Sequence, residues 1–427
     1  MFTFAFLCII MNIILFEGDF IMETITSKEL LGQMFESLES VYPEMIEVRR
    51  DFHMHPELSF KEVRTPRIIA DHLKSLGLET YENVGTSGVV GILRGAHPGP
   101  TVGLRADFDA LPMNDEKDAP YKSTVEGVTH ACGHDIHTTA LMMLERVLVK
   151  YKDQLHGNVV FIHQHAEEEP PGGASEIIAS GLLKDVDFIY GAHVWDEGVL
   201  GEVGFTEGYA MGAGDNFEIH LHGDGGHGAR PHTSVDTLVA GCQLVGNLQN
   251  IVSRRLDPQK SGVVTVGTIR SGDSYNVIPS KAYIAGTSRC YDNETKMAMR
   301  ESIEHISKTT AEQFGATAEV IFAEGYDAVY NHIHETRNLK ALIGSHVPEL
   351  KVLDKAPALT AEDFADYLKV IPGTLLFVGA QMDDSKPKYT LHHPKFDPDE
   401  RSMVNIGKVF LTAVSHHLLG LEGAHEQ

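Results

Sequence analysis

Two apolar segments that lie close together in the sequence decide the fold class: GVVGILRG at residues 88–95 and TVGLRAD at residues 101–107. Each is apolar at nearly every position rather than at alternate positions, which is typical of strands buried on both faces of a sheet. Such a sheet needs helices to cover it, so the two segments predict an α/β layer architecture.

The flanking sequence alternates between helical and strand-like patterns in the way this architecture requires. Apolar residues at helical spacing predict helices over 27–54, 63–76, 136–151, 174–183 and 399–418. Short apolar runs predict further strands over 158–166, 188–194 and 373–380. We therefore expect one helix-covered mixed sheet, formed by residues 23–212 together with residues 326–427.

The order of elements changes after a glycine-rich stretch at 211–215. A strand, a helix, two strands, a helix and a strand are expected over 216–222, 233–254, 263–270, 280–290, 293–314 and 316–322. This β-α-β-β-α-β order is the ferredoxin-like unit. We predict that an inserted α+β domain of residues 213–325 interrupts the larger, discontinuous domain.

Composition and charge exclude several classes of protein. The 427 residues include 60 Asp and Glu against 35 Lys and Arg, a formal charge of −25. Such a field repels phosphate backbones and anionic membrane surfaces, so neither nucleic acid nor membrane is expected as a partner. Four scattered cysteines cannot form a disulfide framework, which favours a reducing, cytoplasmic location.

The N-terminal residues form an apolar run from Phe2 to Phe16. The run is short of the roughly 20 residues that span a bilayer, and the first basic residue, Lys28, follows it. We interpret residues 1–22 as a non-native start, with translation beginning at Met22, or as a disordered apolar leader. A signal or membrane anchor and a buried N-terminal element are the alternatives.

Five patches carry side chains that bind metals, each at the end of a predicted strand or in the loop after it. They are GLRADFDALPM (103–113), HACGHDIHTTA (130–140), FIHQHAEEEPPGGA (161–174), GAHVWD (191–196) and LHHPKFDPDE (391–400). In α/β sheets, sites are built at such positions. The patches therefore predict one site assembled from distant segments.

Two of the patches are informative by themselves. Cys132 and His134 can bind one metal ion from a single turn of the chain. The alternative is a polar loop with a buried cysteine. Glu167, Glu168 and Glu169 repel one another unless cations neutralise them, the alternative being a solvated acidic loop. An adjacent glutamate pair can divide its work between binding a metal and accepting a proton.

These patches, with DFHMHPELSF, GHGARPH and NVIP, resemble in order the metal-dependent N-acyl-amino-acid amidohydrolases, from about residue 45 to residue 401. That family includes hippurate hydrolases, aminoacylases and indoleacetyl-amino-acid hydrolases, and it is related to dinuclear zinc aminopeptidases and carboxypeptidases. The resemblance implies two divalent ions, zinc or manganese, with cobalt or nickel as substitutes in vitro. It implies five metal ligands: Cys132, His134, Glu168, His193 and His392.

The resemblance also implies the remaining roles. Glu167 takes the position of the general base that activates a metal-bridged water, and Asp107 that of a supporting aspartate. In the inserted domain, which would act as a lid and dimerisation domain, His227 would polarise the scissile carbonyl in the site of a partner subunit. Asn276 and Arg289 would bind the free carboxylate of the substrate.

The expected function is hydrolysis of N-acyl amino acids to a carboxylic acid and a free amino acid, by a homodimer that joins through its inserted domains. A dipeptidase or aminopeptidase on the same scaffold and a non-catalytic metal-binding relative are the alternatives. The chain departs from the family pattern at His165, at Glu169 with the prolines after it, and after Trp195, where the usual proline is missing. These departures leave the preferred acyl group open.

Overall fold

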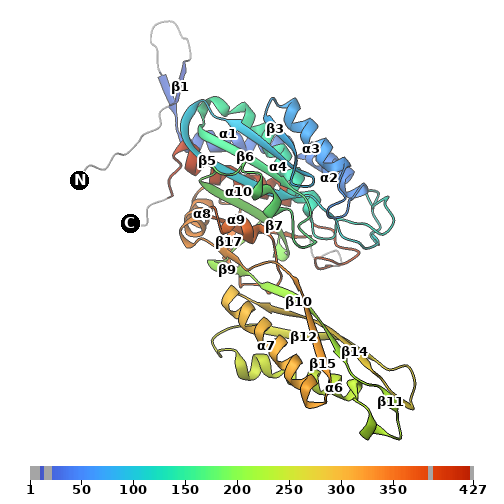
Figure 1. The fold of residues 1–427 in the computed structure, drawn as a ribbon. Coiled ribbons are helices and arrows are strands. Elements are labelled where there is room, and N and C mark those ends of the chain that lie inside the picture. Colours follow the sequence, from blue (N-terminus) through green and yellow to red (C-terminus); the bar gives the residue numbers. More distant parts are fainter. Residues whose placement is uncertain (1–9, 14–21, 383–387, 424–427) are drawn as a thin grey trace, which may run out of the picture. The chain divides into compact units, whose positions relative to one another are not determined.

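The computed structural model describes residues 10–13, 22–382 and 388–423. The chain divides into two compact units (Figure 1). Unit 1 comprises Met1–Gly208, Asn331–Ala356 and Asp366–Gln427, and unit 2 comprises Tyr209–Tyr330 and Pro357–Ala365.

Unit 1 is built on an eight-stranded mixed sheet. Its order is β17 (Lys351–Asp354), β8 (Glu202–Phe205), β18 (Gly373–Gln381), β7 (Phe188–Val199), β5 (His97–Asp107), β6 (His156–Gln164), β4 (Gly88–Arg94) and β3 (Glu79–Val84). The central strands β18, β7, β5 and β6 run parallel, and β4 is antiparallel to β6. Every residue of β4 except Arg94 is buried, as is every residue of β5 from Thr101 onward. The predicted helix-covered mixed sheet is confirmed.

Helices pack on this sheet and on one another. They are α1 (Ser27–Ser40), α2 (Tyr42–Met54), α3 (Arg64–Ser75), α4 (His134–Lys150), α8 (Ile333–His346) and α10 (Ser402–Leu419), with the short α5 (Ala174–Ala179). The short α9 (Phe364–Leu368) begins in unit 2 and ends in unit 1. Helices α4 and α10 contact each other and strand β5. The prediction of a single helix over 27–54 is wrong, because the helical conformation is interrupted at Val41, between α1 and α2. Pro43 lies in the first turn of α2, where its missing N–H costs nothing.

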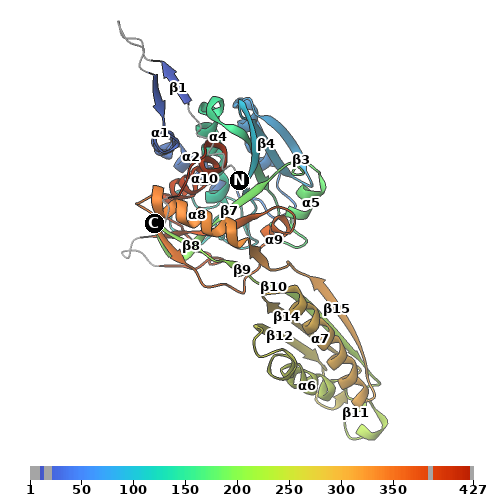
Figure 2. The same cartoon turned by 90° about the vertical axis from the view of Figure 1, so that its left-hand side faces the viewer.

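Unit 2 has the predicted β-α-β-β-α-β order. Its elements are β10 (Ala213–His222), α6 (Thr237–Leu248), β12 (Gly262–Ser271), β14 (Lys281–Cys290), α7 (Asn293–Gln313) and β15 (Thr317–Glu324). The four strands form an antiparallel sheet in the order β12-β14-β10-β15. Helices α6 and α7 lie side by side on it and share one apolar core with the strands (Figure 2). Helix α6 begins later than predicted because Asp236 caps it, accepting from the amides of Leu238 and Val239.

The N-terminal prediction falls largely outside the described residues. Within the interval 1–22, only residues 10–13 and residue 22 are described. They belong to β1 (Ile10–Ile13) and β2 (Met22–Ile25), which pair antiparallel. Among the helices that the structure describes, none combines the length and the apolar character that crossing a bilayer requires.

Candidate active site

Three of the predicted site residues lie on the parallel strands of unit 1 or in the loop after one of them. Strand β5 ends at Asp107, Glu167 follows strand β6, and β7 contains His193. Helix α4 begins at His134, directly after Gly133, whose φ of 87° is left-handed. A Cβ at Gly133 would lie 2.5 Å from a methyl group of Val194, so this tight turn requires glycine.

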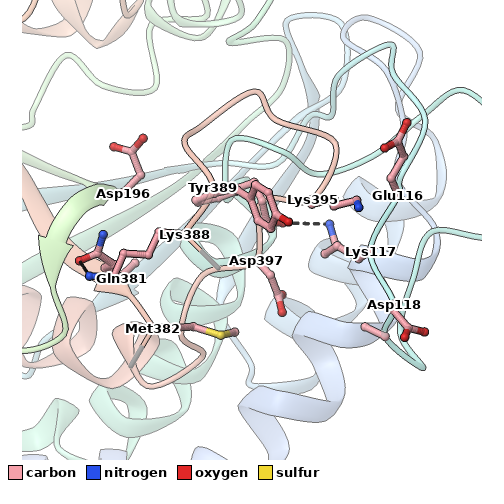
Figure 3. Close-up of a pocket in the computed structure, with 13 residues that line it drawn as sticks. Glu116, Lys117, Asp118, Asp196, Gln381, Met382, Lys388, Tyr389, Lys395 and Asp397 are labelled. Carbon is pink, nitrogen blue, oxygen red and sulfur yellow. Dashed lines mark hydrogen bonds between the residues drawn. The ribbon is translucent and has the colours of Figure 1, made fainter. Parts of the chain in front are cut away.

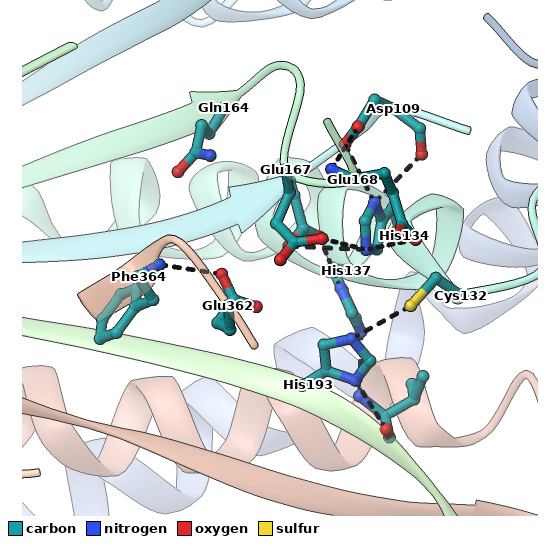
Figure 4. A network of polar contacts seen from close by, with 12 residues as sticks. Asp109, Cys132, His134, His137, Gln164, Glu167, Glu168, His193, Glu362 and Phe364 are labelled. Atoms are coloured by element: carbon teal, nitrogen blue, oxygen red, sulfur yellow. Dashed lines mark hydrogen bonds and ion pairs between the residues drawn. The ribbon is translucent and has the colours of Figure 1, made fainter. Parts of the chain in front are cut away.

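The five predicted ligand side chains come together in this part of unit 1. Cys132 groups with His134 and His193, and it also groups with Glu168 and His392, with donor atoms within 4.8 Å of one another in each group. The Cys132 Sγ lies 3.5 Å from His193 Nε2, and His392 Nε2 lies 3.3 Å from Glu168 Oε1. Figure 4 shows four of these side chains converging from different elements.

Backbone and carboxylate contacts fix how two of the imidazoles face the cluster. The Nδ1 of His134 lies 3.0 Å from the carbonyl oxygen and 3.1 Å from the Oδ1 of Asp109, so it carries the proton and donates. The Nδ1 of His193 likewise donates to the carbonyl of Val194 at 2.7 Å. Each ring therefore presents the lone pair of Nε2 to the cluster, as a metal-binding histidine does.

Carboxylate oxygens surround one imidazole nitrogen at the buried centre of the cluster. His134 Nε2 is buried without a hydrogen-bond partner in the described part of the chain. Around it lie carboxylate oxygens of Asp107 at 3.8 Å, Glu167 at 3.8 Å and Glu168 at 3.9 Å, all too distant for hydrogen bonds. A lone pair surrounded by carboxylates in this way fits a site for metal cations.

The acid–base balance of the cluster leads to the same conclusion. Burial, together with Glu168 and Glu167, raises the pKa of the Cys132 thiol well above its usual value. Burial lowers the pKa of His134, but Asp107, Asp109 and Glu168 outweigh it and raise this pKa to about 10. Without a metal the cluster would therefore hold protons in place of cations. Divalent ions would instead stabilise the thiolate and the neutral imidazole.

Asp107 is hydrogen-bonded to a histidine that adjoins the cluster. The Nε2 of His137 accepts the N–H of Val194 at 2.9 Å, so its Nδ1 carries the proton and donates to Asp107 Oδ1 at 2.6 Å. Burial lowers the pKa of His137 to about 4 although Asp107 opposes this shift, so the ring is neutral. Asp107 also bonds to Arg105. Through His137, Asp107 is thus linked to the backbone of Val194, the residue next to His193.

A cavity of about 330 Å³ lies beside the segment that contains His392 (Figure 3). Residues 116–119 and 388–397 contribute most of its lining, including Lys117, Lys395 and Tyr389. The Nζ of Lys117 donates to the carbonyl of Phe396 at 3.0 Å and so ties the two segments together. The sequence patterns did not reveal this cavity, since its walls come from distant loops.

The three predicted residues of the inserted unit do not form one group. His227 lies on β11 (Gly226–His227), which pairs with β13 (Val277–Ile278), and Asn276 adjoins that strand; both side chains are exposed. Arg289 lies near the far end of β14, eight residues beyond Lys281 and thus roughly 25 Å along the strand. Within one chain, Arg289 is therefore remote from the ribbon that holds His227 and Asn276.

Sequence reasoning missed two residues beside the acidic loop, Ser59 and Glu62. Both lie in or next to the quoted motif DFHMHPELSF, yet nothing in its pattern indicated what they contact. Ser59 donates to Asp109 at 2.7 Å, and Glu62 accepts the amide of Ala166 at 2.9 Å.

The chain is similar to known proteins over most of its length. Residues 103–416 match the family model described as peptidase family M20/M25/M40. A Bacillus subtilis protein assigned as amidohydrolase YhaA is 43% identical over 391 residues, covering 91% of this chain and 99% of its own. The N-acyl-L-amino acid amidohydrolase of Geobacillus stearothermophilus is 40% identical over 296 residues, 69% of this chain and 80% of its own.

A solved structure extends the likeness to the whole fold. The YXEP protein of Bacillus subtilis, described as a dinuclear metal-binding peptidase of the M20 family, superposes with a TM-score of 0.76 at 30% identity. The match covers 88% of this chain and 98% of that one. The chain therefore belongs to peptidase family M20/M25/M40 and is a hydrolase of that family.

Proposed function

We propose that the protein hydrolyses the amide bond of N-acyl amino acids and releases a carboxylic acid and a free amino acid. The observation that carries this proposal is the convergence of five side chains of metal-ligand type, with Glu167 grouped beside two of them, His134 and Glu168. The Geobacillus stearothermophilus relative is named for this activity, which supports the same substrate class here.

Two divalent ions complete the proposed centre. Cys132, His134, Glu168, His193 and His392 would hold them, and a set of thiolate, imidazole and carboxylate donors suits zinc, with manganese as the alternative. When bound, the ions supply Lewis acidity, which polarises an amide carbonyl and lowers the pKa of water.

Glu167 is the proposed general base. It is buried, and its Oε2 lies 3.8 Å from His134 Nε2, while the neighbouring Glu168 contacts His392. Glu167 can therefore face the attacking water while Glu168 binds metal. It accepts the proton of the water and passes it to the nitrogen of the departing amino acid.

The inserted unit is proposed to dimerise the protein and to complete the substrate site. Arg289 and His227 are too far apart within one chain to contact the same small molecule. If both bind one substrate, His227 and Asn276 must come from a second copy. Light scattering should give a dimer, and a fully active strict monomer would exclude this arrangement.

Glu167→Gln tests the base, with Glu169→Gln as the matched control because Glu169 is exposed in the same loop. We expect Glu167→Gln to lower kcat by roughly 10²–10⁴-fold, the usual contribution of general acid–base catalysis, with unchanged metal content. Glu169→Gln should retain the parental kcat and the parental metal content. Turnover by Glu167→Gln at the parental rate would exclude Glu167 as the base.

The substrate class is tested with metal-stripped protein reloaded with zinc, manganese or cobalt. N-acetyl and N-benzoyl amino acids should be hydrolysed, and unblocked dipeptides should not. Faster cleavage of the unblocked dipeptides would indicate a peptidase instead. Absence of all hydrolysis with two bound metals would indicate a non-catalytic relative.

A further inference from the structure

Ala166, which directly precedes the proposed base Glu167, has an unusual backbone conformation. Its φ of 51° lies in the left-handed region, which residues with a side chain seldom adopt. Such conformations persist only where the surrounding contacts hold them, and they cluster at functional sites. The conformation of Ala166 decides where the chain directs Glu167.

A buried carboxylate holds this residue from a segment 104 positions earlier in the sequence. Glu62 is 4% exposed, its Oε1 accepts the N–H of Ala166 at 2.9 Å, and its Oε2 accepts the hydroxyl of Ser87 at 3.0 Å. The Gly173 amide also donates to the Ala166 carbonyl, at 3.2 Å, which closes the loop after the strand.

A second buried carboxylate holds the other side of Glu167. Asp109 Oδ2 accepts the N–H of Glu168 at 3.0 Å, so the amides before and after Glu167 each donate to a buried acid. Asp109 also bonds to the proposed ligand His134, and its replacement would disturb the metal site. Glu62 hydrogen-bonds to Ala166 and Ser87 rather than to a proposed metal ligand, so a change at Glu62 acts on the base more directly than a change at Asp109 would.

We propose that Glu62 is a positioning residue for the reaction, which holds Ala166 in its left-handed conformation and thereby aims the Glu167 carboxylate. The inference rests on the proposed function, since it takes Glu167 as the general base. The neutral form of Glu62 makes the same contacts, its carbonyl accepting from Ala166 and its hydroxyl donating to Ser87. Burial, with Asp109 adding to it, raises the pKa of Glu62 to about 7, so both forms occur near neutrality.

Two conservative variants separate the effect of the length of the Glu62 side chain from the effect of its charge. Glu62→Gln keeps the length and an oxygen acceptor for the Ala166 amide, so kcat should stay within about threefold of the parent. Glu62→Asp keeps the charge but is one methylene shorter. It should lower kcat by roughly 10–100-fold, since a misplacement of about 1 Å can cost 10²-fold. KM and the metal content should not change in either variant.

Two further measurements test the mechanism directly. Hydrogen exchange in the metal-free protein should be faster for the Ala166 amide in Glu62→Asp than in Glu62→Gln. In an Ala166→Gly background the left-handed conformation no longer needs support, so Glu62→Asp should lose much less of kcat there. Equal losses in both backgrounds, or full activity of Glu62→Asp, would overturn the proposal.

The outcome is separable from that of the proposed function. If Glu167→Gln retains activity, the base assignment fails, whatever the Glu62 variants do. If Glu167→Gln is inactive and Glu62→Asp matches the parent in kcat and in exchange, only the positioning role fails.

Discussion

Replacing Arg49 with methionine should destabilise unit 1 strongly. Arg49 has no exposed side-chain surface, and its Nε lies 2.9 Å from Asp135 Oδ2. Glu400 and Asp397 lie farther from the guanidinium, at 3.4 and 3.6 Å, and Glu400 keeps a second partner in Arg50. Without Arg49, Asp135 would stay buried and lose its guanidinium partner, keeping His53 at 2.6 Å and the amide of Ile136, which donates to its Oδ1 at 3.0 Å.

The size of the effect follows from the burial of both charges. Removing one partner of a fully buried ion pair typically costs about 3–5 kcal/mol, because the other charge stays uncompensated. A domain has only about 5–15 kcal/mol of stability in total, so the loss should be easy to measure. Arg49→Met combined with Asp135→Asn removes both charges, and the double variant should recover most of the loss.

The assay is urea unfolding followed by tryptophan fluorescence. Trp195 is the only tryptophan of the chain and lies on β7, so its signal reports on unit 1. Chelator in all samples keeps metal binding out of the comparison. Arg67→Met is the matched control, since the Arg67 side chain is 82% exposed, and its midpoint should equal that of the parent.

The pH dependence has a definite sign. Burial favours the neutral form of Asp135, but Arg49 and His53 outweigh it and hold the pKa of this carboxyl well below its usual range. A lowered pKa in the folded state stabilises at neutral pH, and this contribution is lost as the pH falls below about 4. The difference between parent and Arg49→Met should therefore be largest near pH 7 and shrink on acidification. A loss below about 1 kcal/mol at pH 7, or no recovery in the double variant, would refute the reasoning.

Two more predictions concern the metal site and the core. Cys132→Ser should retain less metal than the parent after dialysis against chelator, counted by elemental analysis, because a hydroxyl replaces a proposed thiolate ligand. Cys242→Ser is the control, since Cys242 is exposed. Equal metal content in Cys132→Ser and the parent would remove Cys132 from the proposed ligands. Asn331→Ala should cost about 2–4 kcal/mol in the same urea assay, because buried Asn331 bonds to the Thr206 carbonyl and to both backbone groups of Leu375. A loss under about 1 kcal/mol would show that these backbone groups find other partners.

Much of the fold could be predicted because burial leaves a clear pattern in the sequence. Strands β4 and β5 are buried on both faces, and the apolar segments 88–95 and 101–107 indicated both. The edge strands β3 and β17 were missed, since their residues are mostly exposed or half-buried and show no apolar run. Strand patterns weaken in this way wherever only part of a strand packs against neighbours.

The sequence by itself determined which chemical groups the protein brings to its site, because metal-binding side chains are recognisable by type and spacing within each short motif. Only the tertiary structure decided how these groups face one another: that His134 and His193 present Nε2, that Asp107 bonds to His137, and that Glu62 reaches the Ala166 amide. The physical reason is that a hydrogen bond depends on distance and direction between segments far apart in the chain. No local pattern of residues records those distances.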